Sequence, residues 1–243
     1  MRVNCQVISC NLVNHSTHQV MLKPADDVDV FYEAGQYLNL LLPDGKPCPF
    51  SIASNCKRTN LLELHILEIP GQSSSGDVIS LLSGQNTVKV ELPFGDCTLS
   101  NLPALLETDA LIFIAAGTGF AQVKSLLDEV VAESLPNPVY LYYGVRKAAD
   151  FYLQDLVKDW REAHPAFNYV PVVSEADEAC RWQGRTGLLH EIIREDFEHL
   201  ESAQVFLSGS PLMVYATLDV LVDHGLDEAR AYSDVFSYAP RDS

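Results

Sequence analysis

The segment with the clearest signal for binding chemistry is Ala115-Ala116-Gly117-Thr118-Gly119-Phe120, which follows an apolar run and precedes a helical pattern. Glycines at such a turn let the backbone approach a bound group, and the start of the helix offers unpaired N–H donors. Open parallel sheets bind ligands there, beyond the carboxyl ends of their strands. The dinucleotide fingerprint is incomplete, because Gln122 stands where a third glycine is expected, so a plain tight turn is the alternative.

Two further turns in the same half strengthen the binding hypothesis. Ser208-Gly209-Ser210-Pro211 also lies between an apolar run and a helical pattern, with the proline in the first helical turn. Gly184-Arg185-Thr186-Gly187 precedes a helix expected to begin near Leu188. Arg185 could face a phosphate there, or it is an exposed arginine beside a capping threonine. Two glycine-bearing strand ends on one sheet edge predict a ligand crevice.

The N-terminal half contains three segments of interest. In Cys48-Pro49-Phe50-Ser51-Ile52-Ala53-Ser54 the proline removes a ladder donor, which predicts a short or edge strand with backbone open to a ligand. Ala34-Gly35-Gln36-Tyr37-Leu38 begins another strand with a glycine. Gly71-Gln72-Ser73-Ser74-Ser75-Gly76 could form an anion nest, but its composition favours a plain surface loop.

The spacing of apolar residues changes near residue 103. Before it, six short apolar segments separated by turn signals predict a small antiparallel barrel or sandwich. The expected strands are Val3–Leu12, Gln19–Leu22, Gln36–Leu42, Phe50–Ala53, Leu61–Leu67 and Thr87–Leu92, with a short helical stretch at Val78–Leu82.

After residue 103, strands alternate with helices, which predicts a doubly wound parallel sheet. The expected strands are Leu111–Ala116, Val139–Val145, Tyr169–Val173, Ala203–Leu207 and Ala231–Phe236, and the expected helices are Ala121–Glu133, Asp150–Arg161, Leu188–Leu200 and Pro211–His224. The predicted fold class is therefore two-domain, an antiparallel β-barrel (residues 1–103) followed by a doubly wound α/β domain (residues 104–243).

Composition and charge exclude several classes of function. The 243 residues, 47% hydrophobic and 20% charged, suffice for two globular cores. With 16 basic against 33 acidic residues the net charge is −17, which repels nucleic-acid backbones and anionic membrane surfaces. No apolar run approaches the roughly 20 residues of a membrane span, and the N-terminus does not resemble a signal peptide. We expect a soluble cytoplasmic protein that binds neither nucleic acid nor membrane.

The cysteines predict no metal site. The six lie at positions 5, 10, 48, 56, 97 and 180, with no C-x-x-C pair and no zinc-like or iron–sulfur-like spacing. Without an export signal, free thiols are expected.

Five motifs in order make nearly the whole chain resemble the ferredoxin–NADP reductase superfamily. They are Gly35-Gln36-Tyr37, Pro49-Phe50-Ser51, Pro93-Phe94-Gly95, Gly117-Thr118-Gly119-Phe120 and Gly209. Size, Gly184-Arg185-Thr186-Gly187 and the ending Ser233-Asp234-Val235-Phe236 are most similar to the small NAD(P)H:flavin oxidoreductases, including the type that supplies bacterial luciferase. The resemblance implies a flavin-binding barrel before a pyridine-nucleotide-binding domain.

The resemblance also implies a reaction, hydride transfer from nicotinamide C4 of NADH or NADPH to N5 of FMN, FAD or riboflavin, with the flavin as a dissociable substrate. Ser51 is implied to hydrogen-bond flavin N5 and Thr118 to lie beside the nicotinamide, on opposite walls of one cleft. The binding residues expected on this basis are Gln36, Tyr37, Pro49, Phe50, Ser51, Gly117, Thr118, Gly119, Phe120, Arg185, Gly209, Ser210 and Phe236. Phe236 and Tyr238 either cover the flavin or fill the sheet core.

The chain departs from the family pattern in two informative places. Cys48 stands where the family has an arginine that helps to hold the flavin, and Lys46 nearby lacks a planar fork, so we expect loose flavin binding. After Ser174, Glu175 replaces the arginine of NADP-preferring relatives, and Asp177 and Glu178 follow. We therefore expect NADH to be preferred, although Arg181 opposes this argument.

Two other functions remain open. The protein could pass electrons to a protein partner, such as an oxygenase component or a ferredoxin, or it could be a flavin-binding sensor without turnover. For a free-flavin reductase the partner expected is a flavin-consuming monooxygenase or luciferase.

Overall fold

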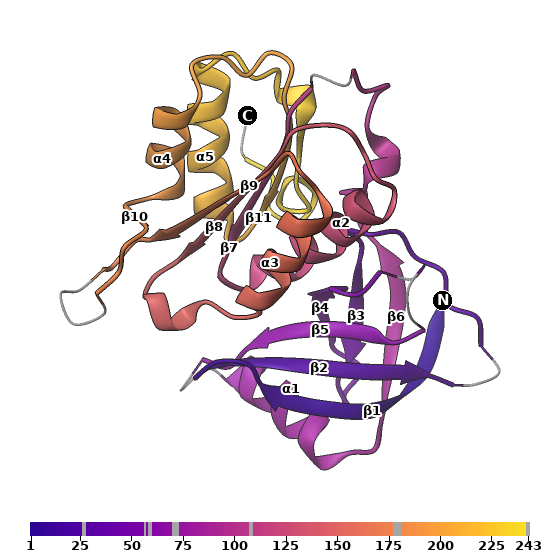
Figure 1. Ribbon diagram of the computed structural model, residues 1–243. Helices are drawn as coiled ribbons and strands as arrows, with labels where there is room; N and C mark the ends of the chain where they lie inside the picture. Colours follow the sequence, from indigo (N-terminus) through magenta and orange to yellow (C-terminus); the bar gives the residue numbers. More distant parts are fainter. Residues whose placement is uncertain are drawn as a thin grey trace.

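The computed structural model describes residues 1–25, 28–55, 57, 60–69, 73–106, 109–176 and 181–241. Two six-stranded sheets divide these residues, the first antiparallel and the second parallel. They lie side by side in Figure 1, with helix α2 (Phe120–Ala132) beside their junction. The fold class expected from the sequence, a barrel followed by a doubly wound sheet, is confirmed.

The antiparallel sheet has the strand order β4-β3-β6-β1-β2-β5. Its strands are β1 (Arg2–Leu12), β2 (Thr17–Pro24), β3 (Tyr37–Leu41), β4 (Pro47–Ser51), β5 (Leu62–Leu67) and β6 (Thr87–Phe94). Alternate side chains such as Val20, Leu22 and Leu38 point into one apolar core. The backbone N–H of Ala53, just beyond β4, donates to the carbonyl of Glu63 on β5 at 2.7 Å, which brings the two ends of the curled sheet together.

All six predicted strands of this half exist, but β4 begins earlier than expected. It pairs with β3 from Pro47 opposite Leu41 to Ser51 opposite Tyr37. An edge strand tolerates its prolines because its outer side needs no ladder donors. The predicted short helix extends to Ser73–Gly84 (α1) and packs against the barrel core through Val78 and Leu82. Gly71 and Gln72 of the serine-rich loop lie outside the described residues.

The second sheet has the strand order β10-β9-β8-β7-β11-β12, and every neighbouring pair is parallel. Its strands are β7 (Leu111–Ala116), β8 (Val139–Val145), β9 (Phe167–Val173), β10 (Arg185–Thr186), β11 (Gln204–Ser208) and β12 (Ala231–Tyr232). Helices α2 and α3 (Gln154–Ala163) cover one face, and α4 (Leu189–Asp196) and α5 (Pro211–Asp223) cover the other. β6 ends at Phe94, so the boundary proposed near residue 103 falls in the connection between the sheets.

Three predicted elements of this half differ most from the structure, each at one end. The last strand stops at Tyr232, and a short helix, α6 (Val235–Tyr238), follows in place of further strand. α3 begins at Gln154 rather than Asp150, because the chain is extended at Phe151 after a short 3₁₀ turn and Leu153, just before α3, is left-handed (φ 53°). α4 ends at Asp196 rather than Leu200, because Phe197 is extended.

Helix α2 joins the two sheets. The amide of its Gln122 donates to the carbonyl of Gly35 at 2.7 Å, and the hydroxyl of Ser125 accepts from the N–H of Gly35 at 2.9 Å. Gly35 has a positive φ of 95°, and a Cβ there would overlap the carbonyl oxygen of Cys97, so only glycine fits. The loop before β3 is therefore held directly on α2.

Every helix in the described part of the chain is too short or too polar to cross a membrane. Within the same ranges, His, Cys, Asp and Glu side chains form no group of three that could hold a metal ion. Cys5, Cys10, Cys48 and Cys97 are free thiols, whereas Cys56 and Cys180 lie outside the described residues.

Candidate functional site

The glycine turn lies at the carboxyl edge of the parallel sheet, as expected. Residues Gly117–Gly119 form a 3₁₀ turn between β7 and α2, and Gly117 has a φ of 54°. A Cβ on Gly119 would overlap the carbonyl oxygen of Ser208, the last residue of β11. Glycine at this position therefore lets two neighbouring strand ends approach closely. Within the described residues, the hydroxyl of Thr118 has no hydrogen-bond partner and is available to a ligand.

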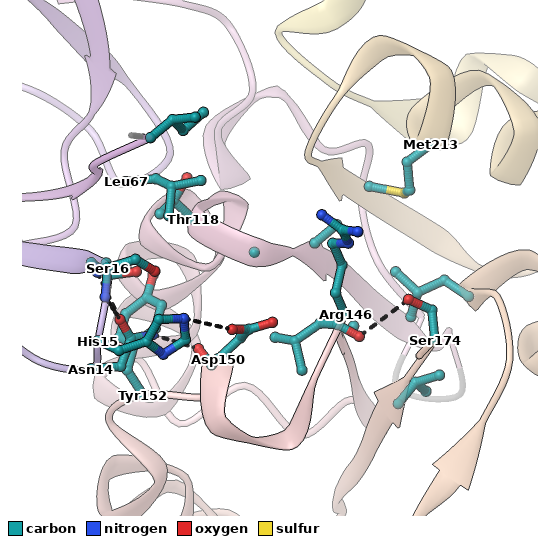
Figure 2. Close-up of a pocket in the computed structure, with 18 of the residues that line it drawn as sticks. Asn14, His15, Ser16, Leu67, Thr118, Arg146, Asp150, Tyr152, Ser174 and Met213 are labelled. Carbon is teal, nitrogen blue, oxygen red and sulfur yellow. Dashed lines mark hydrogen bonds and ion pairs between the residues drawn. The ribbon is translucent and has the colours of Figure 1, made fainter. Parts of the chain in front are cut away.

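A cavity of 430 Å³ opens at this turn, and both halves of the chain line it. One wall is the end of the parallel sheet, where Gly117, Gly144 and Gly187 are among the lining residues. The opposite wall is the β1–β2 hairpin tip, residues 14–17, together with the end of β5. Figure 2 shows Leu67 of β5 beside Thr118, and Asn14 and His15 facing Asp150.

Hydrogen bonds fasten the hairpin tip to the second half. The amide of Asn14 donates to the backbone carbonyl of Asp150 at 2.7 Å, and the His15 ring lies 3.3 Å from the Asp150 carboxylate. Tyr152, which also lines the cavity, meets the buried ring of His65 at 3.0 Å. The barrel is therefore part of this site rather than a separate module.

A charged pair lies at the outer edge of the cavity. Arg146, which follows β8, contacts the Glu175 carboxylate at 2.7 Å, and this contact lowers the pKa of Glu175. Backbone hydrogen bonds continue the β8–β9 ladder to this point, because the N–H of Glu175 donates to the carbonyl of Arg146. Asp177 and Glu178 lie outside the described residues.

The residues of the cavity fit a pyridine nucleotide. A volume of 430 Å³ is within the usual range for small-molecule sites, and Leu67, Val172 and Met213 supply apolar surface for flat rings. Thr118 and Ser174 supply hydroxyls, and the start of α2 supplies backbone donors for an anionic group. Arg146 is the one arginine or lysine among the described lining residues, so backbone donors matter more than side-chain cations here.

The predicted flavin motifs lie together at a second place, on the barrel side of α2. Ser51 is opposite Tyr37 in the β3–β4 pair, and the Tyr37 ring stacks on Phe94 with centroids 5.5 Å apart. The side chain of Gln36 donates to the carbonyl of Gly95 at 2.9 Å. Among the described residues, the Ser51 hydroxyl has no hydrogen-bond partner, which suits a hydroxyl meant for a ligand atom. Pro49 is exposed on edge strand β4, beside the half-buried Phe50.

The cavity brings together only part of the predicted site. Of the predicted residues, Gly117 and Thr118 line it, and Gln36, Tyr37, Pro49, Phe50, Ser51, Gly119, Phe120, Arg185, Gly209, Ser210 and Phe236 do not. The ring of Phe120 is buried and stacks on Tyr143, so any role of this residue is through its backbone. Gly209 packs against Ala116, and the Ser210 hydroxyl caps the start of α5.

Arg185 and Phe236 have other partners in this structure. The guanidinium of Arg185 contacts Glu195 at 2.5 Å and Asp196 at 2.8 Å, so facing a phosphate would require leaving two carboxylates. Phe236 is partly buried against the core under α5, and its ring centroid lies 5.8 Å from that of Tyr215. This favours the alternative in which Phe236 fills the sheet core rather than covering the flavin. Tyr238 is 63% exposed.

Asp234 is a site candidate that the sequence analysis did not single out. Its carboxylate accepts a hydrogen bond from Gln122 at 2.7 Å, and it lies so close to Gly95 that a Cβ there would be 2.8 Å away. Burial, reinforced by the charge of Asp96 and opposed by the bond from Gln122, raises the pKa of Asp234 to about 6. A strongly perturbed carboxyl beside the Tyr37 ring is typical of a functional site.

Gln122 also has a structural role that the dinucleotide fingerprint does not indicate. The sequence shows it only as the missing third glycine, but its amide bridges the Gly35 carbonyl and the Asp234 carboxylate. Glycine at this position could form neither bond. The departure from the fingerprint is thus a connection between the two halves.

Comparison with known proteins identifies the family. Residues 113–219 match the family model of the oxidoreductase NAD-binding domain. The NAD(P)H-flavin reductase of Vibrio harveyi is 30% identical over 98% of this chain and 100% of that protein. Reductase component 1 of the terephthalate 1,2-dioxygenase of a Comamonas species is 32% identical over 87% of this chain and 61% of that protein.

Solved structures agree with the sequence relatives. The Amycolatopsis cytochrome P450 reductase GcoB superposes with a TM-score of 0.84 at 27% identity, over 96% of this chain and 68% of that one. A ferredoxin NADP⁺ reductase from Neisseria gonorrhoeae shares the fold with a TM-score of 0.77, at 18% identity and 92% coverage of both chains. Sheet order, glycine turn and junction helix thus define a two-domain oxidoreductase. The chain belongs to the ferredoxin–NADP reductase superfamily and, within it, to the family of the NAD(P)H-flavin reductases.

We expect Asp234→Asn to stabilise the protein at alkaline pH. A carboxyl whose folded pKa is raised from 3.8 to about 6 destabilises the fold when ionised, an effect absent below pH 3.8 and complete above pH 6. Asparagine keeps an acceptor for Gln122 and removes the charge. The free energy of unfolding should rise by about 1–2 kcal/mol at pH 8, allowing for partial solvation, and hardly change at pH 3.5.

Denaturant unfolding at the two pH values measures this difference. The control is Asp223→Asn, which removes an exposed carboxylate at the end of α5 and should not show the pH-dependent gain. A variant at position 234 that is less stable than the parent at both pH values would contradict the assignment.

Proposed function

We propose that this protein is an NAD(P)H:flavin oxidoreductase that reduces free or loosely bound flavin. The main observation behind the proposal is that α2 connects the two predicted binding motifs. The glycine turn leads into its first residue, and its side chains bond to Gly35, in the loop that begins the flavin motif of the barrel. The match to a flavin reductase over that protein's full length supports it. When bound, the nicotinamide supplies a hydride at C4 and the flavin accepts it at N5.

The nucleotide side of the proposal rests on the 430 Å³ cavity. Backbone donors of residues 117–119 would hold the anionic part of the nucleotide against the overall charge of −17. Thr118 would orient the nicotinamide, and the apolar side chain of Leu67 would exclude water from the reacting face. The hairpin tip, residues 14–17, would close the far side of the cavity.

The flavin side rests on β4. As an edge strand it offers backbone groups outside the ladder, and Ser51 adds a hydroxyl that would donate a hydrogen bond to flavin N5. Cys48 gives β4 no cationic fork, so binding would depend on ring contacts and on the backbone. Weak retention of the flavin is consistent with flavin as a substrate.

A protein partner as electron acceptor is the second candidate. The matches to a dioxygenase reductase component and to a cytochrome P450 reductase favour it; this chain spans 61% and 68% of those proteins. We favour free flavin as the acceptor because Cys48 gives β4 no planar cationic group to retain a flavin permanently. A monooxygenase or luciferase that consumes reduced flavin would be the downstream partner.

We expect the purified protein to oxidise NADH only when flavin is added. The assay follows NADH absorbance with and without FMN, FAD or riboflavin, after the visible spectrum of the protein alone has been recorded. A colourless protein that turns over with added flavin supports the proposal. A yellow protein that is inert with free flavin but reduces a ferredoxin supports the second candidate, and no NADH oxidation under any condition indicates a non-catalytic flavin sensor.

We expect Ser51→Ala to slow the chemical step about 10- to 100-fold, the effect of losing one well-placed hydrogen bond in the transition state. Single-turnover flavin reduction in a stopped-flow instrument measures this step, and NADH affinity should stay unchanged. Ser80→Ala, at an exposed position on α1, is the matched control and should behave as the parent. Equal rates for Ser51→Ala and the parent would refute the role of Ser51.

We also propose that NADH is preferred over NADPH, because Glu175 adds negative charge beside Arg146 and occupies its guanidinium. Glu175→Gln should raise kcat/KM for NADPH by about tenfold, since Arg146 is then free to meet an added phosphate. The gain should vanish in the double variant Arg146→Met/Glu175→Gln.

Steady-state kinetics with both nucleotides measures this preference. Glu198→Gln, an exposed carboxylate beyond α4, is the control for general loss of charge. A parent enzyme with higher kcat/KM for NADPH, or a gain that persists without Arg146, would disprove the idea.

A further inference from the structure

A buried ammonium group lies between the two halves of the protein. Lys124, on the second turn of α2, is only 8% exposed. Its Nζ donates to the carbonyl of Ala53 at 3.0 Å, and it contacts the carboxylates of Glu63 at 3.0 Å and Asp128 at 3.2 Å. All three N–H donors of the ammonium group therefore have partners.

The carboxylates around Lys124 are themselves held. Glu63, on β5, accepts from Gln19 at 2.6 Å and contacts His65 at 2.9 Å, while Asp128 accepts from the indole of Trp160 at 2.9 Å. Burial would raise the pKa of Glu63, but the bond from His65 and the charge of Lys124 outweigh it and lower the pKa to about 2. The cluster is thus charged, satisfied and fixed in geometry.

Stability alone does not explain such a cluster. Desolvating charges is expensive, and apolar side chains of similar volume often stabilise a junction equally well or better. What the ammonium adds is three N–H donors, each of which meets an oxygen held by its own element, so a shift of the two halves would break at least one of these contacts. One of these oxygens, the Ala53 carbonyl, belongs to the segment that leaves edge strand β4.

Lys124 and its partner Ala53 each lie close in the sequence to one of the two residues predicted to contact the reacting rings. Ala53 lies two residues after Ser51, and Lys124 lies six residues after Thr118 on the helix that the glycine turn begins. We propose that Lys124 is a positioning residue that fixes the distance between Ser51 and Thr118, and with it the stacking of nicotinamide on flavin. This inference rests on the proposed function, because it concerns the alignment of those two rings.

The energetic consequence is a loss of rate rather than of affinity. A displacement of about 1 Å between reacting groups can cost about 100-fold in rate. Each ring has its own binding surface, one on β4 and one at the parallel sheet, so each would still bind when the halves shift. Removing the contacts of Lys124 should therefore lower kcat and leave KM for NADH nearly unchanged.

The test uses a neutral cluster, because Lys124→Met alone would leave two buried carboxylates unpaired. In the triple variant Lys124→Met/Glu63→Gln/Asp128→Asn the neighbours keep acceptors for His65 and Trp160, but the Ala53 carbonyl loses its donor. We expect this variant to unfold at nearly the temperature of the parent and to reduce flavin 10- to 100-fold more slowly in single turnovers. KM for NADH should change less than threefold. The single variant Lys124→Arg, which keeps the positive charge and the N–H donors, should lose less of the rate than the triple variant.

Lys57→Met is the matched control. Lys57 also connects the barrel side to α2, through Glu129 at 2.9 Å and Glu133 at 2.7 Å, but its side chain is exposed. Its removal should leave the single-turnover rate unchanged. If both lysine variants slow the reaction equally, the effect is general weakening of the junction and the assignment to Lys124 is wrong.

Hydrogen exchange of the ligand-free protein separates this inference from the proposed function. In the neutral-cluster variant, the Ala53 amide, which bonds to Glu63, should exchange faster than in the parent, while the core strand β7 should not change. Unchanged exchange at Ala53, or a neutral-cluster variant as fast as the parent, overturns the positioning role. A parent that reduces no flavin overturns the proposed function, whatever the exchange data show.

Discussion

The structure depends on hydrogen bonds from the side chains of one helix to backbone groups of the other half of the chain. Gln122, Lys124 and Ser125 of α2 satisfy both polar groups of Gly35 and the carbonyl of Ala53. Buried backbone groups must be paired, so the two loops cannot leave α2 without losing these bonds. Because the loops lead into β3 and follow β4, α2 fixes the barrel motif relative to the glycine turn from which it starts.

This arrangement also decides how a negatively charged protein can hold a negatively charged nucleotide. The net charge is −17, and Arg146 is the one lysine or arginine among the described residues that line the cavity. Attraction by the whole protein is therefore not available. What remains are local dipoles: the start of α2, and the backbone of three glycines that line the cavity. Close strand ends make these dipoles converge, and Gly119 against Ser208 is what allows the approach.

The sequence predicts what is local and periodic and misses what joins distant segments. Strands β7 and β8 have the predicted bounds because their side chains are apolar throughout, and the glycine turn follows directly. The Lys124–Glu63 contact and the Gln122–Asp234 bond join positions 61 and 112 residues apart, and no pattern along the chain marks either pair. Polar residues on the buried face of α2 were a signal, since burial of Lys124 requires partners, but their identity depends on tertiary packing.

The absence of an arginine at position 48 is functionally related to the rigid junction at α2. A reductase that keeps its flavin permanently can use the bound flavin itself to hold barrel and sheet in alignment. If the flavin leaves after each turnover, as Cys48 favours, that contribution is lost in every cycle and the polypeptide alone must preserve the geometry. Directional bonds to backbone carbonyls do this better than an apolar interface, because apolar surfaces can slide at little cost. The loose flavin binding that we propose would thus depend on the charged, fully paired junction of this chain.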